Sequence, residues 1–122
     1  GAKMGNGRLT THILDTARGK PAANVTVRLF KLLDGQRHLV LQTTTNDDGR
    51  TDAPMASGSD LVVGGYELEF EAGDYLRATQ QLGAGLSFLE TVVLRFNITN
   101  ADQHYHVPLL LSPFAYSTYR GS

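Results

Sequence analysis

Cysteine is absent from this chain of 122 residues. Its absence excludes disulfides, thiol nucleophiles, redox-active cysteine pairs and zinc or iron–sulfur sites built on thiolates. An excess of charge is also missing, because 11 Lys and Arg against 12 Asp and Glu leave a formal net charge of −1. A chain this close to neutral lacks the basic surface that favours nucleic acid or an anionic membrane as a partner. Any chemistry must come from His, Ser, Tyr, carboxylate, Arg or backbone groups.

Long hydrophobic runs are missing as well. No stretch approaches the ~18 apolar residues of a membrane helix, and the start lacks the apolar core of a signal peptide. We therefore predict a cytoplasmic protein, unless a targeting segment was removed before this sequence begins. The length and a hydrophobic content of 41% predict one globular domain. We assign residues 1–7 to a flexible N-terminal tail or remnant and residues 8–122 to the domain.

The dominant periodicity of the chain is two, which is typical of half-buried strands. The clearest case is the alternation of Tyr66, Leu68 and Phe70 with glutamates between residues 67 and 71. One segment differs, because 74–82 begins with an N-cap residue, Asp74, and is followed by Gly83, which favours a short helix. An antiparallel β-sandwich is the fold class that this pattern favours. Strands are predicted near residues 9–14, 25–33, 38–45, 50–54, 64–71, 88–98, 103–111 and 114–120.

The four histidines are the first candidates for proton transfer, because an unperturbed imidazole titrates near neutral pH. His104 and His106 alternate with large apolar residues, so they project from the opposite face of their strand, together with Pro108 and Leu110. His12 lies in a strand far away in sequence, and His38 occupies an exposed hairpin position.

Several interpretations of these groups stay open at this point. The histidines are surface residues of strands, or His104, His106 and a third histidine bind zinc, although no carboxylate stands at convincing ligand spacing. A serine–histidine arrangement is formally possible, but no G-x-S-x-G elbow is present. Arg50, at the exit of a tight turn, is either solvated or suited to a planar anionic substrate. The C-terminal run ends in aromatic and arginine side chains, which indicates an ordered tail.

Three segments together resemble the transthyretin-related 5-hydroxyisourate hydrolase family. They are LTTHILDTA at residues 9–17 with Gly19, Pro21 and Ala22 after it, TNDDGR at 45–50, and the run from HYHVPLLLSPF to the closing YRGS at 104–122. The similarity extends from about residue 8 to the end, and YRGS is its most specific element. Hormone-carrying transthyretins share the fold but lack that ending and the histidine pair. Phe114, where many relatives have Tyr, is a small departure outside the site.

The resemblance implies an all-β, prealbumin-like (transthyretin-like) sandwich of two four-stranded sheets with one short helix. It also implies a homotetramer in which facing sheets enclose a channel, so Leu110, on the face of His106, is a candidate for subunit contact. The implied activity is hydrolysis of 5-hydroxyisourate to 2-oxo-4-hydroxy-4-carboxy-5-ureidoimidazoline in urate degradation, without metal or cofactor. The residues carried over are His12, Arg50 and His106 as catalytic groups, and His12, Arg50, Tyr119, Arg120, Gly121 and Ser122 as substrate-binding groups.

These residues suit the opening of a cyclic amide by water. His106 and His12 would share general-base work on water and proton delivery to the leaving nitrogen. Arg50 would anchor the purine-derived anion, while the tail from Tyr119 would close the site, with Ser122 as an orienting group. The alternatives are a non-catalytic carrier of the transthyretin type using the same channel and a β-sandwich interaction module. Neither explains why His12, Arg50, His106 and YRGS occur together.

Overall fold

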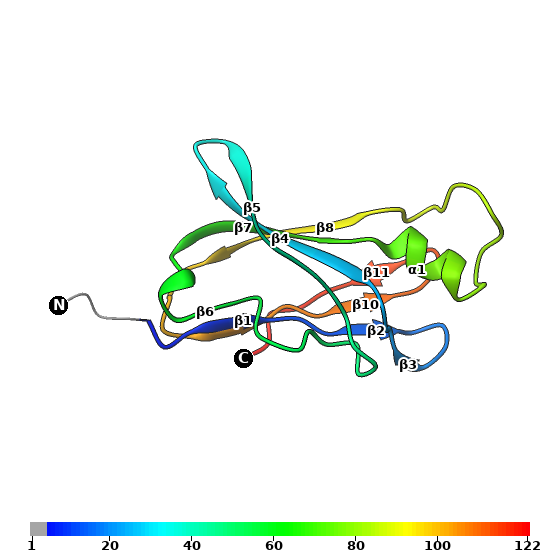
Figure 1. Cartoon of the computed structure of the whole chain (residues 1–122), viewed down its shortest axis with the longest axis horizontal. Helices are drawn as coiled ribbons and strands as arrows, with labels where there is room; N and C mark the ends of the chain where they lie inside the picture. The colour runs from blue at the N-terminus through cyan, green and yellow to red at the C-terminus, as the bar shows by residue number, and fades with distance from the viewer. Residues whose placement is uncertain (1–4) are drawn as a thin grey trace.

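Two layers of β-strands face each other across a hydrophobic core in this computed structural model, which describes residues 5–122. One layer is a four-stranded antiparallel sheet (Figure 1) in the order β5 (Gln36–Thr44), β4 (Thr26–Leu33), β7 (Gly64–Phe70) and β8 (Val92–Ile98). The expected all-β sandwich with one short helix is confirmed. The helix, α1 (Ala72–Ala78), follows β7 directly.

The second layer consists of two sheets that continue one another. A four-stranded sheet has the order β11 (Tyr116–Ser117), β10 (Leu109–Leu111), β2 (Ile13–Asp15) and β3 (Lys20–Pro21). A three-stranded sheet extends it, in the order β6 (Ala56–Ser57), β1 (Arg8–Thr10) and β9 (His104–His106). A 3₁₀ turn, η1 (Gly58–Asp60), follows β6. The pairs β1–β9 and β2–β10 are parallel, so this layer is mixed rather than purely antiparallel as expected.

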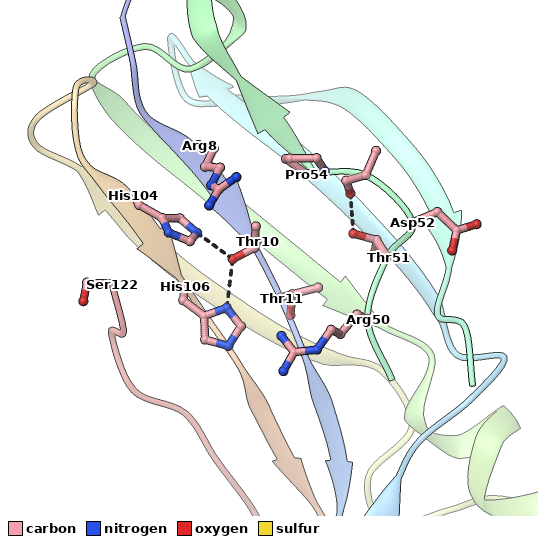
Figure 2. Close-up of a pocket in the computed structure, with 11 residues that line it drawn as sticks. Arg8, Thr10, Thr11, Arg50, Thr51, Asp52, Pro54, His104, His106 and Ser122 are labelled. Carbon is pink, nitrogen blue, oxygen red and sulfur yellow. Dashed lines mark hydrogen bonds between the residues drawn. The ribbon is translucent and has the colours of Figure 1, made fainter. Parts of the chain in front are cut away.

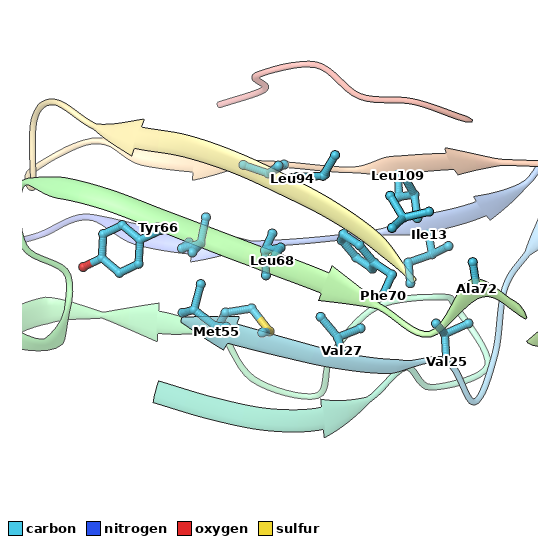
Figure 3. Packing of buried hydrophobic residues seen from close by; sticks show 14 of the residues in the cluster. Ile13, Val25, Val27, Met55, Tyr66, Leu68, Phe70, Ala72, Leu94 and Leu109 are labelled. Carbon is cyan, nitrogen blue, oxygen red and sulfur yellow. The ribbon is translucent and has the colours of Figure 1, made fainter. Parts of the chain in front are cut away.

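The core lies where the alternation of side chains predicts it. Tyr66, Leu68 and Phe70 of β7 are fully buried, and Phe70 lies near Ile13 and Leu109 of the opposite layer (Figure 3). Each fully buried side chain of this size contributes roughly 1.5–3 kcal/mol to folding. The interdigitated layers therefore hold the second sheet rigidly, and the candidate site residues lie on that sheet.

One glutamate departs from the expected alternation. Glu67 of β7 is only 3% exposed although it lies on the outer face of its sheet. Arg95 on β8 donates to Glu67 Oε1 from Nε at 2.8 Å and from Nη2 at 2.6 Å, and Arg37 on β5 also contacts the carboxylate. Cross-strand arginines therefore cover a carboxylate that the sequence pattern places in solvent.

Two expected strands, 9–14 and 103–111, are each divided in the structure. Both divisions occur at the same level, where the hydroxyl of Thr11 donates to Val107 O at 2.7 Å in place of a backbone N–H. The register continues across the gap, since Val107 N donates to Thr10 O and Leu109 N donates to His12 O, each at 2.9 Å. His12 is thereby left outside β1 and β2 and is free to pair with a third segment.

The other differences concern the ends of elements. Segment 50–54 is not a strand, and β6 forms instead after Pro54. The strand expected at 88–98 begins at Val92, the one at 114–120 shrinks to β11, and β3 forms where no strand was predicted. The helix begins at Ala72 rather than at residue 74, and Gln80, at φ 60°, ends it before Gly83.

The expected N-terminal tail, residues 1–7, lies partly outside the described residues, which begin at Gly5. Gly7 is buried and donates its N–H to Ala101 O at 3.0 Å, while Asn6 N donates to Asp102 Oδ1 at 3.3 Å. Asn6 and Gly7 therefore pack against the domain rather than extending from it. Within residues 5–122, no helix has the length and apolar character needed to span a membrane.

Candidate active site

His12 and His106 approach one another across the parallel pair of segments that forms the middle of the second layer. Their ring centroids are 6.5 Å apart and their planes are inclined by 44°. His106 is the last residue of β9, and His12 lies in the gap between β1 and β2. The adjacent backbone hydrogen bonds to Thr10 and His12 fix both positions in the sheet.

A tight turn positions Arg50 beside the histidines. The backbone of Arg50 forms an isolated antiparallel bridge with His12, next to a hydrogen bond of 2.8 Å from Ile13 N to Gly49 O. Asn46 Oδ1 accepts hydrogen bonds from the backbone N–H groups of Asp48 at 2.9 Å and of Arg50 at 3.2 Å. Gly49 has φ 76°, and a Cβ there would lie 2.5 Å from Ile13 O. Glycine therefore allows the turn to press against the sheet and present Arg50.

The C-terminal tail is tied to His106 through its backbone. Gly121 N donates to His106 O at 2.7 Å, and His106 N donates to Gly121 O at 3.1 Å. A Cβ on Gly121 would lie 3.2 Å from the Cβ of His106, so the absence of a side chain permits this approach. Ser122, the last residue, reaches the wall of the cavity described next.

A cavity of about 510 Å³ opens beside these residues (Figure 2). Its wall comes from β1, β9, the segment 50–54 and the C-terminal residue, and it includes the side chains of Arg50 and His106. His12 is not part of that wall. The Nε2 atom of His12 is buried without a hydrogen-bond partner among the described residues, so His12 lies beside the cavity, next to His106.

Tyr119 and Arg120 lie elsewhere. The guanidinium of Arg120 stacks over the ring of Tyr105 at 4.3 Å, and its Nη2 donates to Gln103 Oε1 at 3.0 Å. Both Tyr119 and Arg120 line a second cavity of about 360 Å³ against β8. Within one chain the structure thus brings together His12, Arg50, His106, Gly121 and Ser122, and it directs Tyr119 and Arg120 away from that group.

The sequence pattern did not assign Arg8, Thr10 and His104 to the site, yet all three line the larger cavity. The Oγ1 atom of Thr10 lies 2.8 Å from His106 Nδ1 and 3.0 Å from His104 Nε2. Knowledge of the parallel register of β1 and β9 would identify these residues, because it places Arg8 opposite His104 and Thr10 opposite His106. His38 is exposed on β5, as expected.

Positive charge and burial favour neutral histidines at this site. Burial lowers the pKa of His106 below its ordinary value, and Arg50, His12 and His104 lower it further. Burial and then Arg50 lower the pKa of His12, while Asp48 partly offsets this effect. At neutral pH the rings are therefore uncharged and able to accept a proton, beside a fixed cation that can bind an anion.

The possibility of a metal site can be tested on the geometry of the ligating side chains. Among the residues that the structure describes, no group of three His, Cys, Asp or Glu side chains converges to hold a metal ion. His104 and His106, the pair considered for zinc, each direct one ring nitrogen to the same threonine hydroxyl. The arrangement instead offers a base, a second imidazole and a cation around an open polar cavity.

Fold and site together define a class: small transthyretin-like β-sandwiches that carry a histidine pair and an arginine at a surface cavity. The chain belongs to the HIUase/Transthyretin family, whose profile matches residues 9–121. It is similar to 5-hydroxyisourate hydrolase 2 of Rhizobium meliloti, with 54% identity over 117 residues, covering 96% of this chain and 98% of that protein. It is 52% identical to 5-hydroxyisourate hydrolase of Pseudomonas aeruginosa, covering 95% of this chain and 92% of that one.

Solved structures show the same relationship. The structure of (S)-allantoin synthase superposes with a TM-score of 0.91 at 45% identity, covering 97% of this chain, which spans only 44% of that longer protein. Klebsiella pneumoniae 5-hydroxyisourate hydrolase gives a TM-score of 0.77 at 34% identity, covering 95% of this chain and 99% of that one. Sea bream transthyretin in complex with thyroxine gives 0.83 at 26% identity, covering 93% and 94%.

Proposed function

We propose that this protein is an enzyme that hydrolyses 5-hydroxyisourate to 2-oxo-4-hydroxy-4-carboxy-5-ureidoimidazoline, a step of urate degradation. The observation that carries the proposal is the approach of His106 to His12, at 6.5 Å between ring centroids, beside Arg50 at the cavity. Relatives that cover nearly the whole chain at more than half identity are 5-hydroxyisourate hydrolases, which supports the same substrate.

The chemistry is attack of water on the C6 carbonyl of a cyclic amide. His106, which lines the cavity, takes one proton from water as the oxygen bonds to C6. The carbonyl oxygen becomes an oxyanion, which the guanidinium of Arg50 stabilises. The N1–C6 bond then breaks, and N1 receives the proton that the histidine pair took from water. The ring opens to a carboxylic acid at C6, which releases its own proton to solvent and becomes a carboxylate. Each group is one that this chain supplies, and no cofactor enters the scheme.

His12 serves this scheme as the partner of His106. It lies outside the cavity wall, so it acts on the charge and proton of the neighbouring ring more directly than on substrate. Gly121 holds the tail against His106, and Ser122 contributes a hydroxyl at the cavity.

The tail residues that face away from the cavity fit a larger assembly. We propose a homotetramer, as the family resemblance implies, in which neighbouring subunits cover the open cavity. Tyr116 and Tyr119 are exposed beside β8, whose outer edge is unpaired within the described chain. Tyr119 and Arg120 would then bind substrate only by way of the assembled channel. Leu110, which is half-buried in the single chain, remains the candidate contact, and the cytoplasm remains the proposed location.

The second candidate is a non-catalytic carrier that uses the same channel. The observation in its favour is the structural similarity to a transthyretin that binds thyroxine. A carrier, however, has no requirement for His12, Arg50 and His106 at one cavity. Removal of an imidazole from an enzyme would abolish the chemical conversion of the ligand. Removal of an imidazole from a carrier would only change the affinity for the ligand.

An ultraviolet assay separates the two. 5-Hydroxyisourate is generated freshly from urate with urate oxidase, and its decay is followed with and without the protein. We expect decay far above the spontaneous rate, unchanged by a strong chelator and unchanged in His38→Ala, whose side chain is exposed on β5. Decay at the spontaneous rate with folded protein would contradict the enzyme, and loss of the rate with chelator would contradict metal-free hydrolysis. Sedimentation velocity tests the tetramer.

A further inference from the structure

A single hydroxyl group joins two histidines at the cavity wall. Thr10 Oγ1 lies 2.8 Å from His106 Nδ1 and 3.0 Å from His104 Nε2 (Figure 2). The contact follows from the parallel register of β1 and β9, which pairs Thr10 with His106 and directs both histidines to the same face. These distances are those of good hydrogen bonds, so the three side chains form one connected network.

The hydrogen count of this network restricts the tautomers of the two rings. A threonine hydroxyl has one proton, so it can donate to only one of its two imidazole neighbours. Between two neutral rings, the other ring must donate to the hydroxyl oxygen. Either His106 donates from Nδ1 and Thr10 donates to His104, or His104 donates from Nε2 and Thr10 donates to His106.

The two arrangements differ in what His106 offers to the cavity. In the first, Nδ1 of His106 carries the proton, and Nε2 presents a lone pair. In the second, Nε2 carries the proton and cannot act as a base. In Figure 2 the free ring nitrogen of His106 points away from Thr10, toward the side of the cavity where Arg50 lies. A guanidinium attracts a lone pair and repels an N–H, so Arg50 favours the first arrangement.

We propose that Thr10 and His104 are positioning residues that hold His106 in the tautomer with the proton on Nδ1 and the lone pair on Nε2. The catalytic meaning of this tautomer rests on the proposed hydrolase function. The chain of donors runs from His106 Nδ1 to Thr10 Oγ1 and from Thr10 to His104 Nε2. When His106 Nε2 takes a proton from water, the Nδ1–H is already in place, and no hydrogen bond has to be rearranged.

The charges around the network act in the same direction. His106 faces Arg50 on the turn after β5, His12 in the gap after β1, and His104 on its own strand. His104 faces Arg8 on β1 and Arg120 in the tail, and burial together with these two arginines lowers the pKa of His104. A neutral His104 retains the lone pair that Thr10 needs as its acceptor.

Nuclear magnetic resonance of the full chain labelled with ¹⁵N-histidine tests the tautomer directly, without substrate. In the wild type at mildly alkaline pH we expect His106 with a protonated Nδ1 and an unprotonated Nε2. Thr10→Val removes the hydroxyl at nearly constant volume, and Thr10→Ser retains it. We expect Thr10→Val and His104→Phe to give His106 a mixture of tautomers, and Thr10→Ser to preserve the wild-type form.

The matched control is Thr16→Val. Thr16 Oγ1 donates to the backbone carbonyl of Leu111 at 3.1 Å and hydrogen-bonds to neither histidine. We expect the wild-type tautomer in this control. A protonated Nε2 on wild-type His106, or a tautomer unaffected by both Thr10→Val and His104→Phe, would overturn the proposal. His104→Phe, which removes the other end of the network, keeps the test informative if the valine variant fails to fold.

Turnover provides a second readout. Thr10→Val and His104→Phe are expected to lower kcat roughly 10-fold, a fraction of the ~10²–10⁴-fold that a general base supplies, while KM stays near the wild-type value. An equal change in KM instead of kcat would contradict a positioning role. Failure of the hydrolase function is distinguishable, because inactivity toward 5-hydroxyisourate would leave the measured tautomer of His106 unchanged.

Discussion

His12 and His106 lie with their ring centroids 6.5 Å apart, yet only His106 reaches the wall of the cavity. The interruption of both sheet segments at the level of Pro108 brings about this difference, because it leaves His12 outside the strands and paired with Arg50. Two histidines of the same chemical type thus have different access to a ligand. Different roles follow, with the base at the cavity and the second ring behind it.

Removal of the cavity imidazole is expected to abolish most of the hydrolysis. His106→Ala deletes the proposed base, whose contribution is about 10²–10⁴-fold in rate. The backbone bridge from residue 106 to Gly121 does not require the side chain, so the fold is expected to persist. Initial rates of 5-hydroxyisourate decay, together with circular dichroism, measure both effects.

A comparison of three alanine variants makes that test specific. His38→Ala removes an exposed imidazole on β5 and is expected to leave the rate unchanged. His12→Ala is expected to lower the rate less than His106→Ala, because His12 acts through its neighbour. Near-normal turnover in His106→Ala would show that His106 is not the base. A greater loss of rate in His12→Ala than in His106→Ala would show that the two histidines have the opposite roles.

The pH dependence of the reaction follows from the charge next to the histidines. The neutral form of His106 is the active one, so the rate falls on the acid side as the ring takes up a proton. Burial and the Arg50 guanidinium lower the pKa of His106, which places this acid limb below the ordinary imidazole range. Arg50→Gln removes a positive charge and is therefore expected to move the limb to higher pH.

Two measurements report this shift of the acid limb. Profiles of kcat/KM against pH report the free enzyme, and ring chemical shifts of His106 report its protonation even when Arg50→Gln binds substrate poorly. Arg50→Lys is the matched variant, because it retains the charge but loses the planar fork. We expect it to keep the acid limb near its wild-type position while weakening binding. An acid limb that moves to lower pH in Arg50→Gln would contradict the electrostatic account.

The sequence was sufficient for those parts of the fold that depend on local pattern. The alternation of Tyr66, Leu68 and Phe70 correctly predicts a strand with one buried face. The helix was misplaced because its N-cap residue, Glu71, makes no side-chain capping bond, whereas Asp74 pairs with Arg77 at 2.9 Å inside the helix. Capping rules therefore place the N-cap residue three residues too late.

The site was predictable only in part, for a physical reason. The resemblance of the motifs identified His12, Arg50 and His106, and the structure brings them together. The contact of Thr10 with two histidines depends on the parallel register of β1 with β9, which neither segment encodes alone. Likewise, no local pattern shows that the stacking of Arg120 on Tyr105 turns this side chain away from the cavity.

A methyl group at Gly121 is expected to disturb the tail without changing any polar group. It would lie 3.2 Å from His106 Cβ, which is tighter than an ordinary contact, and 3.4 Å from both His106 Cδ2 and Tyr119 Cε2, at the lower limit of ordinary contacts. The tail or the ring must therefore move, and we expect Gly121→Ala to lower kcat about 10-fold, as misplacement of a catalytic group does. Hydrolysis rates and the His106 ring shifts measure the outcome.

Gly83→Ala is the control for that substitution. A Cβ at Gly83 meets nothing within 4 Å, and its backbone has no positive φ, so we expect wild-type activity. If Gly121→Ala is as active as Gly83→Ala, close packing of the tail on His106 has no role in turnover.

The stability of the domain is expected to depend on a buried carboxylate far from the cavity. Asp15 is 1% exposed, and its Oδ2 accepts hydrogen bonds from Tyr75 Oη at 2.6 Å and Gln81 Nε2 at 2.8 Å. Burial alone would raise the pKa of Asp15, but these bonds and the N–H of Arg18 hold it below its ordinary value of 3.8. The carboxylate thus stabilises the fold above that pH, and this contribution disappears as the pH falls through the lowered pKa.

Tyr75→Phe removes one of these donors and is expected to lower the free energy of unfolding by about 1–3 kcal/mol at neutral pH. The difference from wild type should shrink at acid pH, where Asp15 becomes protonated in both proteins.

A second trend is expected at alkaline pH, because burial and then the bond to Asp15 raise the pKa of Tyr75 from 10.0 to about 12. The wild type should therefore lose the stabilising contribution of Tyr75 as the pH rises from 10 to 12, and the phenylalanine variant has no such contribution to lose. Urea unfolding at several pH values measures both trends, with His38→Ala, at an exposed position of β5, as the neutral control. A difference between Tyr75→Phe and wild type that stays constant across the whole pH range would show that Asp15 and Tyr75 are not coupled.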